Sequence, residues 1–463
     1  MRIEHDTLGD QPVPDGALYG IHTQRALGNF GVSGRRVRLE LIRAIAFVKK
    51  ACVLTHKELN ALPPVVADAL LAACDEVLEG LHDEAFVTDA LQGGAGTSTN
   101  MNVNEVLANL AIGKLGGEFG DYTRVSPLDH VNRGQSTNDV YPSALRITAI
   151  YQVRELADAL AGLQESLQKK EQDFADILKL GRTQLMDAAP IGLGQAFGAY
   201  AQAIARDRWR IYKAEERLRQ INLGGTAVGT GAAADRRYIF RVAEILRELT
   251  GLGLARAEYP MDLTQNCDVF VEVSGLLKAC AVNLLKITSD LRLMNSGPRG
   301  GFGEIRLEAR QVGSSIMPGK VNPVIPECVA QCAMQAIAND TAITLAASNG
   351  QLELNAFMPL IADALLDSLA LLRNAVTRLR TACIDTLEAD PAACACHLHA
   401  STASALLLVP HLGYEAAAAL AKEALETGVP VQQLVAEKRL LPPETIERLL
   451  TPYTPAPRCG PPV

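Results

Sequence analysis

Apolar residues recur at helical spacing through most of the middle of this chain. In one stretch, Val269, Val273, Leu276, Cys280 and Leu284 follow the 3.6-residue period of an α-helix. Segments of this kind, mostly free of interior helix breakers, cover residues 139–176, 189–220, 263–295, 320–349 and 355–386. A helix of about 30 residues spans about 45 Å and exceeds the usual length in globular proteins. The pattern predicts a mainly α-helical protein with a long five-helix bundle, a form that often builds its core between subunits.

The region before the bundle is divided into an irregular start and shorter helices. Residues 1–35 are rich in Gly, Pro and Asp, so we expect an extended arm with short turns. Between about 39 and 118 the apolar spacing predicts three helices. They begin at Leu39, at Pro64 and near Asn102, and the last of them ends before Gly116. Proline is tolerated in a first helical turn.

The tail is more broken than the bundle. Helices are expected near 403–408, 414–426 and 443–451, followed by a proline-rich end that we expect to fray. Within the bundle, Pro142 and Pro190 are expected close to helix starts.

Composition narrows the class of protein. The chain has 463 residues, 48% apolar and only 5% aromatic, which favours packed helices over sheets. Its net charge of −8 argues against nucleic acid as the main partner. It contains no run of about 18 apolar residues, so no membrane span is expected. The charged N-terminus shows no secretion signal, and we expect a cytoplasmic protein.

The ten cysteines are scattered and lie mostly in apolar helical contexts, which suggests buried, reduced thiols. One exception is the sequence Cys394-Ala-Cys396-His397-Leu-His399. Cysteine and histidine are zinc ligands, but the spacing is not that of a common zinc module. Ordinary helix or turn residues are favoured there, and a metal site stays open as the alternative.

Four segments interrupt the helical pattern with Gly, Ser, Thr and Asn, and each is expected to end where a long helix begins. Hydroxyl and amide side chains are the usual helix caps, so each segment alone is explained by capping. Together they offer more polar groups than capping needs, and helix N-termini bind carboxylates. The segments are 92–102, 130–139, 181–187 and 313–323.

The fourth segment is the most informative. It reads Gly313-Ser-Ser-Ile-Met-Pro-Gly-Lys-Val-Asn-Pro323, and its glycines and prolines exclude a regular helix or strand. Two serines, a lysine and an asparagine remain in a shaped loop. These side chains are suited to bind an anion, or to stabilise a catalytic base that carries negative charge. Gly297, Gly300, Gly301 and Gly303 precede the loop as candidate hinges, so we also expect it to close as a lid.

A further glycine-rich stretch, residues 224–231, resembles a nucleotide loop only superficially. It has neither a clear preceding strand nor a Lys-Ser/Thr ending. We interpret it as a packing turn between long helices.

The four polar segments, in this order, resemble the aspartase/fumarase superfamily, and residues 313–323 are similar to its signature. The resemblance extends from Arg2 to Glu415 and is closest to the aspartate ammonia-lyase branch. Phrases that favour this branch are Tyr19-Gly-Ile-His-Thr-Gln-Arg, Gly181-Arg-Thr-Gln-Leu, Gln351-Leu-Glu-Leu-Asn and Asn322-Pro-Val-Ile-Pro-Glu.

The resemblance implies the architecture and the assembly. We expect three domains, at residues 1–137, 138–392 and 393–463, and a homotetramer with a central 20-helix core. Each active site would draw on three subunits. The implied partners are a small dicarboxylate, L-aspartate or fumarate, and ammonia. No cofactor is implied as required, although some relatives are activated by a divalent metal, for which the sequence locates no site.

The resemblance also implies roles for single residues. Ser314 would be the base that removes a proton from Cβ of L-aspartate; the alternative is that Ser314 and Ser315 merely bind carboxylate. Lys320, Asn322 and Thr183 would hold the α-carboxylate. The β-carboxylate would face Thr97, Ser136, Thr137 and Ser315, with Asn138 near the amino group.

This chain departs from the family pattern at several positions. Gln184 stands where fumarases and some aspartases have a histidine that pairs with the residue matching Glu327, so Gln184 is expected to orient the substrate instead. Met186 and Met358 also differ from the usual residues and are expected near the pocket rim. These departures leave open a substituted aspartate as substrate, or another amine leaving group. Two rival functions also remain: fumarate hydratase on the same scaffold, and an inactive structural or binding relative.

Overall fold

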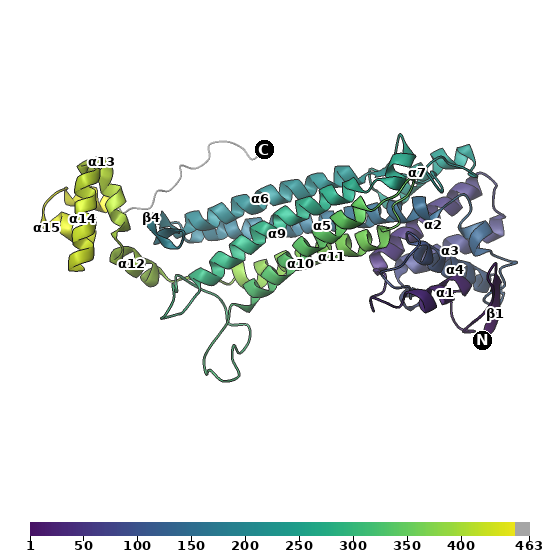
Figure 1. The fold of residues 1–463 in the computed structure, drawn as a ribbon, viewed down its shortest axis with the longest axis horizontal. Helices are drawn as coiled ribbons and strands as arrows, with labels where there is room; N and C mark the ends of the chain where they lie inside the picture. Colours follow the sequence, from purple (N-terminus) through teal and green to yellow (C-terminus); the bar gives the residue numbers. More distant parts are fainter. Residues whose placement is uncertain (450–463) are drawn as a thin grey trace. The chain divides into compact units, whose positions relative to one another are not determined.

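A computed structural model describes residues 1–449 of the chain as a mostly helical protein (Figure 1). The chain divides into two compact units. Unit 1 comprises Met1–Ala157, Trp209–Ala279 and Gln335–Leu372. Unit 2 comprises Asp158–Arg208, Cys280–Met334 and the chain from Arg373 onward. The three-domain division expected from the sequence follows other boundaries and stays a prediction.

The first 35 residues are more ordered than an extended arm. Strands β1 (Arg2–Asp6) and β2 (Gly9–Val13) form an antiparallel hairpin, and helix α1 (Ile21–Phe30) follows. The expectation of an arm was wrong for α1. Its first turn is held from a distance, because the buried Glu105 carboxylate accepts hydrogen bonds from the backbone N–H groups of Gly20, His22 and Thr23. No local sequence pattern reveals a cap that lies about 80 residues away.

The three helices predicted next are present in unit 1. They are α2 (Leu39–Glu58), α3 (Pro64–Glu79) and α4 (Thr97–Lys114). Helix α4 begins five residues before the predicted start near Asn102, so Thr97 lies in its first turn rather than in a loop. Helix α7 (Arg236–Thr250), which packs on α2, had not been predicted.

The five long helices are confirmed. They are α5 (Thr137–Asp173), α6 (Leu193–Leu218), α9 (Asp268–Met294), α10 (Val324–Ser348) and α11 (Met358–Leu379), and Figure 1 shows them running alongside one another. The expected helix at 263–295 is divided, because α8 (Pro260–Gln265) is a separate short helix. The helix expected from 320 starts only at Val324, after Pro323. Pro142 lies in the second turn of α5, near its start as expected.

Polar contacts join neighbouring helices of the bundle inside unit 1. Arg154 of α5 forms a bidentate ion pair with Glu215 of α6, with N–O distances of 2.7 and 2.9 Å. The buried Asp340 of α10 accepts hydrogen bonds from Ser274 and Lys278 of α9 at 2.8 and 2.6 Å. These pairs fix the rotation of each helix about its axis, which apolar packing alone specifies less strongly.

The polar segment around residue 183 belongs to a β-hairpin, not to a helix start. Strand β3 (Leu178–Thr183) pairs antiparallel with β4 (Met186–Gly192), and α6 follows β4. The expectation that this segment ends at a helix was wrong, because β4 follows it. Pro190 lies within β4, near the start of α6 at Leu193 as expected. The sequence had favoured helices over sheets, and a short hairpin of this length leaves little periodic signal.

Two further strand pairs are only two residues long. Strands β5 (Gln220–Ile221) and β6 (Ala255–Arg256) are parallel, whereas β7 (Ile305–Arg306) and β8 (Glu388–Ala389) are antiparallel. The glycine-rich stretch 224–231 follows β5 and leads to α7, so a short strand does precede it. It is a packing turn as interpreted: Gly224 has a positive φ of +87°, and a Cβ there would lie 3.2 Å from Ile239.

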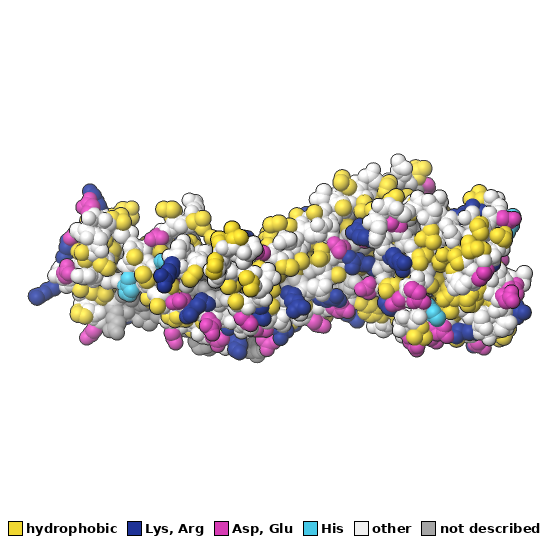
Figure 2. Space-filling view, turned by 90° about the horizontal axis from the view of Figure 1, so that it is seen from below, with side chains coloured by type: hydrophobic (Ala, Val, Ile, Leu, Met, Phe, Trp, Pro, Cys, Tyr) yellow, Lys and Arg dark blue, Asp and Glu magenta, His cyan; other side chains and the backbone are white. Residues whose placement is uncertain are grey.

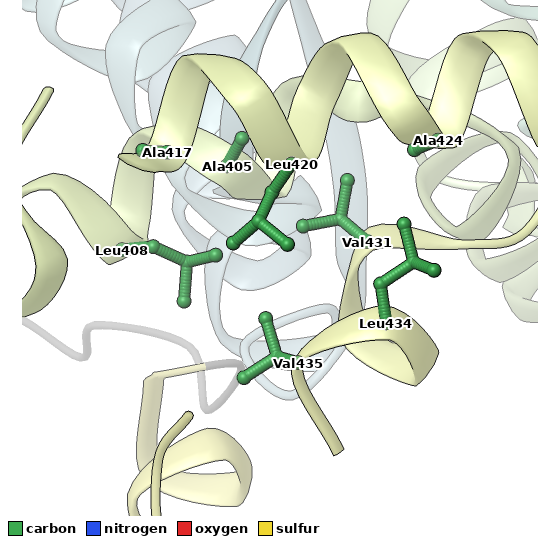
Figure 3. Close-up of a cluster of buried hydrophobic side chains, with 8 residues drawn as sticks. All are labelled: Ala405, Leu408, Ala417, Leu420, Ala424, Val431, Leu434 and Val435. Atoms are coloured by element: carbon green, nitrogen blue, oxygen red, sulfur yellow. The ribbon is translucent and has the colours of Figure 1, made fainter. Parts of the chain in front are cut away.

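The end of the described chain is a cluster of short helices. They are α12 (Pro391–Ala400), a 3-10 helix (Thr402–Leu408), α13 (Val409–Leu412), α14 (Tyr414–Thr427), α15 (Val431–Glu437) and α16 (Pro443–Leu449). Figure 3 shows Leu408, Leu420, Val431 and Val435 pointing toward one another from three of these elements. The segments expected near 403–408 and 414–426 are helical, and the one near 443–451 is helical through Leu449. The expected frayed end lies outside the described residues.

The surface carries both charge signs. Figure 2 shows acidic and basic side chains interspersed with hydrophobic ones on the face that it draws. Within residues 1–449, no single helix is long and apolar enough to cross a membrane; only the bent pair Pro391–Ala400 and Thr402–Leu412 meets that test jointly. Six of the nine described cysteines are buried, and all nine are free thiols.

Candidate active site

A cavity of about 620 Å³ lies in unit 1 where two helices begin. The start of α4 contributes Thr97 and Asn100, and the start of α5 contributes Ser136, Thr137 and Asn138. Four of the predicted site residues therefore line one cavity. Both helices direct their N-terminal ends, which carry partial positive charge, toward it. The cavity is thus suited to a small anion.

The start of α5 serves capping and the cavity at once. Ser136 Oγ accepts a hydrogen bond from the N–H of Asn138 at 3.2 Å, and the N–H of Ser136 donates to Asp139 Oδ1 at 2.9 Å. This reciprocal pair is a capping box. Thr137 is buried, and Asn138 Nδ2 donates to the carbonyl of Ala227 at 2.7 Å. Capping and ligand binding, the two interpretations of this segment, are therefore compatible.

Asp139 anchors the glycine-rich turn to the same corner. Its buried carboxylate accepts the N–H groups of Gly224 at 3.1 Å and Thr226 at 3.0 Å, in addition to that of Ser136. Burial raises the pKa of Asp139 to about 6, although the three backbone donors act in the opposite direction. The sequence analysis did not identify Asp139 as important. The only sequence signal for it is its position three residues after Ser136, the spacing of a capping box.

The start of α4 depends on a glycine. Gly96 precedes Thr97 with φ of +94°, and a Cβ there would lie 2.4 Å from the ring of Tyr141. Since glycine has no side chain, it offers no capping oxygen to the first turn of α4. Thr97 Oγ1 donates to the carbonyl of Gly94 at 2.7 Å. Within this turn the N–H groups of Thr97 and Thr99 already donate to the Gly94 carbonyl and to Gln92 Oε1, each at 3.0 Å.

Behind the cavity lies a buried polar network. Asn132 Oδ1 accepts hydrogen bonds from Lys49 Nζ at 3.0 Å and from the side-chain amides of Asn100 and Asn104, each at 3.1 Å. Lys49 Nζ also donates to Gln135 Oε1 at 2.8 Å. Sequence reasoning missed this network, although a lysine inside the apolar pattern of α2 was a signal that could have indicated it.

Residues 313–323, called the signature loop from here on, lie in unit 2 and position the oxygen of Ser314. Ser314 Oγ accepts hydrogen bonds from the backbone N–H groups of Ile316 at 3.2 Å and Met317 at 2.9 Å. Two donors aimed at one oxygen stabilise an anion there. The sequence had suggested consecutive N–H groups near this serine, and two of them are present; the role of Ser314 stays a prediction.

The loop is closed across its base. The N–H of Gly313 donates to the carbonyl of Lys320 at 3.0 Å, and Asn322 Nδ2 donates to the carbonyl of Gly313 at 2.7 Å. A Cβ at Gly313 would lie 2.2 Å from that Lys320 oxygen, so only glycine fits. Asn322 is thereby engaged in the loop itself, whereas Ser315 and Lys320 are exposed.

The β3–β4 turn presents the remaining two predicted residues. Thr183 ends β3, and Gln184 and Leu185 form the turn with φ of 55° and 65°. Positive φ at both central residues is typical of a type I′ hairpin turn, which usually contains Asn or Gly. Non-glycine residues held in this region store backbone strain. Thr183 and Gln184 are both exposed.

Glu304 joins the hairpin to the segment that leads into the signature loop. It is fully buried and pairs with Lys179 at 2.9 Å and Arg182 at 2.6 Å, both on β3. The Arg182 guanidinium also lies 4.1 Å from the ring centroid of Phe302. Three charges in one buried cluster fix the two segments against each other within unit 2.

The structure thus presents the ten predicted residues in two groups. Unit 1 holds the cavity residues Thr97, Ser136, Thr137 and Asn138, and unit 2 holds Thr183, Gln184, Ser314, Ser315, Lys320 and Asn322. The roles assigned to these residues stay predictions.

Several secondary expectations change. Met186 is exposed, but Met358 is 4% exposed, with its sulfur 3.5 Å from Cys267 Sγ, and is a core residue rather than a rim residue. Glu327, which lacks the histidine partner of the family pattern, has its Oε1 3.8 Å from Nη2 of Arg292.

The candidate hinge glycines form a compact turn. The N–H of Phe302 donates to Ser296 Oγ at 3.0 Å, and that of Gly303 donates to the Ser296 carbonyl at 2.9 Å. A Cβ at Gly301 would lie 2.5 Å from Ser296 Oγ. Glycine is therefore needed for close packing at this point, and closure of the loop stays a prediction.

The Cys-His sequence near residue 396 lies on α12 and makes other contacts. His397 Nε2 lies 2.7 Å from the carbonyl of Phe302, His399 Nδ1 lies 3.0 Å from Gln432 Oε1, and Cys394 is buried. Among residues 1–449, no three His, Cys, Asp or Glu side chains are grouped to hold a metal ion.

Comparison with known proteins shows the class. A family model described as lyase matches residues 9–338, and one described as fumarase C C-terminus matches residues 407–454. The chain belongs to this lyase family, as the resemblance had indicated.

Its relatives include named enzymes. An aspartate ammonia-lyase of a Bacillus species is 44% identical over 98% of this chain and 97% of its own length. That of Escherichia coli K12 is 43% identical over 95% of this chain and 93% of its own length.

Solved structures agree in fold. A fumarate lyase:delta crystallin from Brucella melitensis, bound to cobalt, superimposes with a TM-score of 0.93 at 44% identity and covers 97% of this chain and 98% of its own. A class II fumarase from Schistosoma mansoni superimposes with a TM-score of 0.92 at 32% identity, with the same coverage.

Proposed function

We propose that this protein is an aspartate ammonia-lyase, a carbon–nitrogen lyase that interconverts L-aspartate with fumarate and ammonia. The observation that carries the proposal is the signature loop, in which Ser314 Oγ receives two backbone hydrogen bonds at 3.2 and 2.9 Å. Identity of 42–44% to several aspartate ammonia-lyases over nearly the whole chain supports the choice of substrate.

The reaction begins at Cβ. Ser314, as an alkoxide, removes a proton from this carbon, and the electron pair moves into the adjacent carboxylate to give an enediolate-like intermediate. Collapse of the intermediate forms the carbon–carbon double bond and breaks the Cα–N bond, so that ammonia leaves and fumarate remains. A serine is a weak base unless its anion is stabilised. The N–H groups of Ile316 and Met317 provide that stabilisation.

Binding of the substrate is divided between the two groups of residues. Lys320, Asn322 and Thr183 hold the α-carboxylate, and Gln184 orients the substrate. Thr97, Ser136, Thr137 and Ser315 face the β-carboxylate, with Asn138 near the amino group. The N-terminal ends of α4 and α5 at the unit 1 cavity support the second assignment, because they favour a carboxylate.

The active site is completed by association of subunits. We propose a homotetramer with a 20-helix core, in which three subunits contribute to each site. Large hydrophobic side chains on the bundle helices support association: Val282 of α9 is 52% exposed, and Met334 and Leu345 of α10 are 58% and 60% exposed. Exposed apolar side chains on such long helices are typical of an interface.

Other features complete the proposal. The domains are residues 1–137, 138–392 and 393–463, the enzyme works in the cytoplasm, and the elimination needs no organic cofactor. The sequence locates no site for an activating divalent metal.

The second candidate is fumarate hydratase, favoured by the 32% identity and close superposition of the Schistosoma mansoni fumarase. It would eliminate water from malate on the same scaffold. Against it stands Gln184, which cannot form the His–Glu pair that the family resemblance associates with fumarases.

The test is a substrate screen on the purified full-length protein. Fumarate formation is followed by its ultraviolet absorbance with L-aspartate, L-malate, argininosuccinate and N-substituted aspartates. Rapid turnover of L-aspartate with release of ammonia is expected. Activity on malate alone would favour the hydratase, and inactivity on the whole set would favour a structural relative.

A further inference from the structure

The cavity in unit 1 has a polar floor whose positive charge comes from behind it. Among its described lining residues none is lysine or arginine and His22 is the only ionisable one, although the cavity is proposed to receive a carboxylate. The buried network behind the floor contains one ammonium group, that of Lys49, which is 0% exposed. Lys49 is separated from the cavity by the side chains of Asn132 and Gln135, both of which line it.

Lys49 holds the turn that precedes α5. Its ammonium donates to Asn132 Oδ1 at 3.0 Å and to Gln135 Oε1 at 2.8 Å. The amide nitrogens of these side chains then close the turn: Asn132 Nδ2 donates to the carbonyl of Gln135 at 3.3 Å, and Gln135 Nε2 donates to that of Val131 at 2.9 Å. Residues 136–138 follow directly, so the orientation of Lys49 is transmitted to the start of α5.

A cation in this position has a cost in stability. Both partners of the ammonium are neutral amide oxygens, whereas buried charges are usually paired with opposite charges. The buried carboxylate that attracts Lys49, that of Asp139, is already bonded to three backbone N–H groups. An apolar residue of similar length would fill the same space without desolvating a charge. A lysine at this position therefore points to a role that packing does not provide.

We propose that Lys49 is a positioning residue for dicarboxylate binding: it fixes the amides at the floor of the cavity and supplies the positive charge that attracts a carboxylate to the N-terminal ends of α4 and α5. This inference rests on the proposed function for the identity of the ligand class. Lys49 does not touch the substrate, and it acts through Asn132 and Gln135. In a water-poor interior such a charge acts over several ångströms.

The first experiment compares three full-length variants. Lys49→Met removes the charge, Lys49→Gln retains a hydrogen-bond donor without the charge, and Lys50→Met is the matched control. Lys50 is the next residue on α2, but it pairs with the half-exposed Asp75. The probe is succinate, an unreactive dicarboxylate, with propionate as the monocarboxylate reference, and binding is measured by competitive inhibition and by calorimetry.

Lys49→Met is expected to weaken succinate binding about tenfold or more. Propionate binding is expected to change less, and Lys50→Met is expected to match the wild type. Lys49→Gln is expected to resemble Lys49→Met, because it also lacks the charge. Unchanged succinate affinity in both Lys49 variants, with folding intact by thermal denaturation, would overturn the inference, as would an equal loss for succinate and propionate.

A second measurement needs no variant. Burial lowers the pKa of Lys49 to about 8, whereas the groups that face it titrate elsewhere: Asp139 near 6, and Cys52 and Cys74 near 12. The wild type is therefore expected to lose succinate affinity as pH rises from 7 to 9, since Lys49 loses its proton in this interval. A flat profile would overturn the inference even if both variants failed to fold.

Failure of the inference is distinguishable from failure of the proposed function. A wild type that binds succinate but does not turn over L-aspartate would disprove the lyase activity, and Lys49 would still be judged by its variants. A wild type that turns over L-aspartate, with Lys49→Met showing the same KM and the same succinate affinity, would disprove only the role of Lys49.

Discussion

The two groups of predicted site residues are held in place by different means. Around the cavity of unit 1, side chains are fixed by a buried network that spans α2, α4 and the turn before α5. The signature loop of unit 2 is shaped by hydrogen bonds among its own residues, and Val312 and Ile316 are 88% and 84% exposed. A buried side-chain network favours a fixed binding surface. A loop held mainly by its own backbone can place one reactive oxygen while remaining able to move.

The largest effect is expected from Ser314→Ala, which removes the proposed base from the loop. Turnover of L-aspartate is expected to fall by about a thousandfold or more, with thermal stability unchanged because the loop is exposed. Initial rates and thermal denaturation measure the two quantities.

Ser315→Ala is the matched comparison. It is expected to raise KM with a smaller effect on kcat, since Ser315 is assigned to carboxylate binding. Substantial turnover by Ser314→Ala would show that another group is the base and would leave the loop as a binding element.

The next effect is expected from Glu304→Gln, which tests the anchor of the loop. This change leaves the buried cations of Lys179 and Arg182 without their carboxylate, which costs on the order of 3 kcal/mol. A lower melting temperature is expected, together with reduced kcat because the β3–β4 hairpin shifts against the loop.

Glu308→Gln is the control, since Glu308 forms an ion pair on the surface with Arg310. It is expected to change neither quantity. Equal stability of the two variants would mean that Glu304 does not anchor the loop.

A smaller effect is expected from Gly313→Ala. The added Cβ would lie 2.2 Å from the carbonyl oxygen of Lys320, so the base of the loop must open. We expect kcat/KM to fall about tenfold and the melting temperature to stay the same, because the loop contributes little to the core.

Gly28→Ala is the control, because Gly28 lies on α1 outside the loop and a Cβ there has open space around it. If Gly313→Ala retains full activity, the closure of the loop is not needed to position Ser314.

The smallest effect concerns Asp139 and the rigidity of the unit 1 cavity. Because burial raises the pKa of this carboxyl to about 6, the folded protein holds a proton that the unfolded chain releases near pH 4. The stability contributed by Asp139 is therefore largest near pH 4 and falls as pH rises to 6, by at most about 1.4 kcal/mol per pH unit.

Comparison of the wild type with Asp139→Asn isolates this effect. The melting temperature of the wild type minus that of the variant is expected to be larger at pH 4.5 than at pH 7. A difference independent of pH would show that Asp139 is ionised throughout the interval.

Much of the fold was predictable because apolar periodicity is a local property. The five long helices, α2 and α3 were found from it within a few residues. The failures share a physical cause. Helix α1 depends on the distant Glu105, and α4 starts early because Gly96 adopts a positive φ against Tyr141. The β3–β4 hairpin is too short to show alternation, and α7 was overlooked although Asp235 caps it.

The sequence by itself determined the helical architecture and the family, and it supplied the residues of the proposed site, because spacing and signature are written along the chain. The tertiary structure decided which groups meet. It joined Glu304 to Lys179 and Arg182 of β3, and it placed Lys49 behind the amides of Asn132 and Gln135. Residues 49 and 132 are far apart in sequence, and only packing of α2 against the turn before α5 makes one electrostatic unit of them.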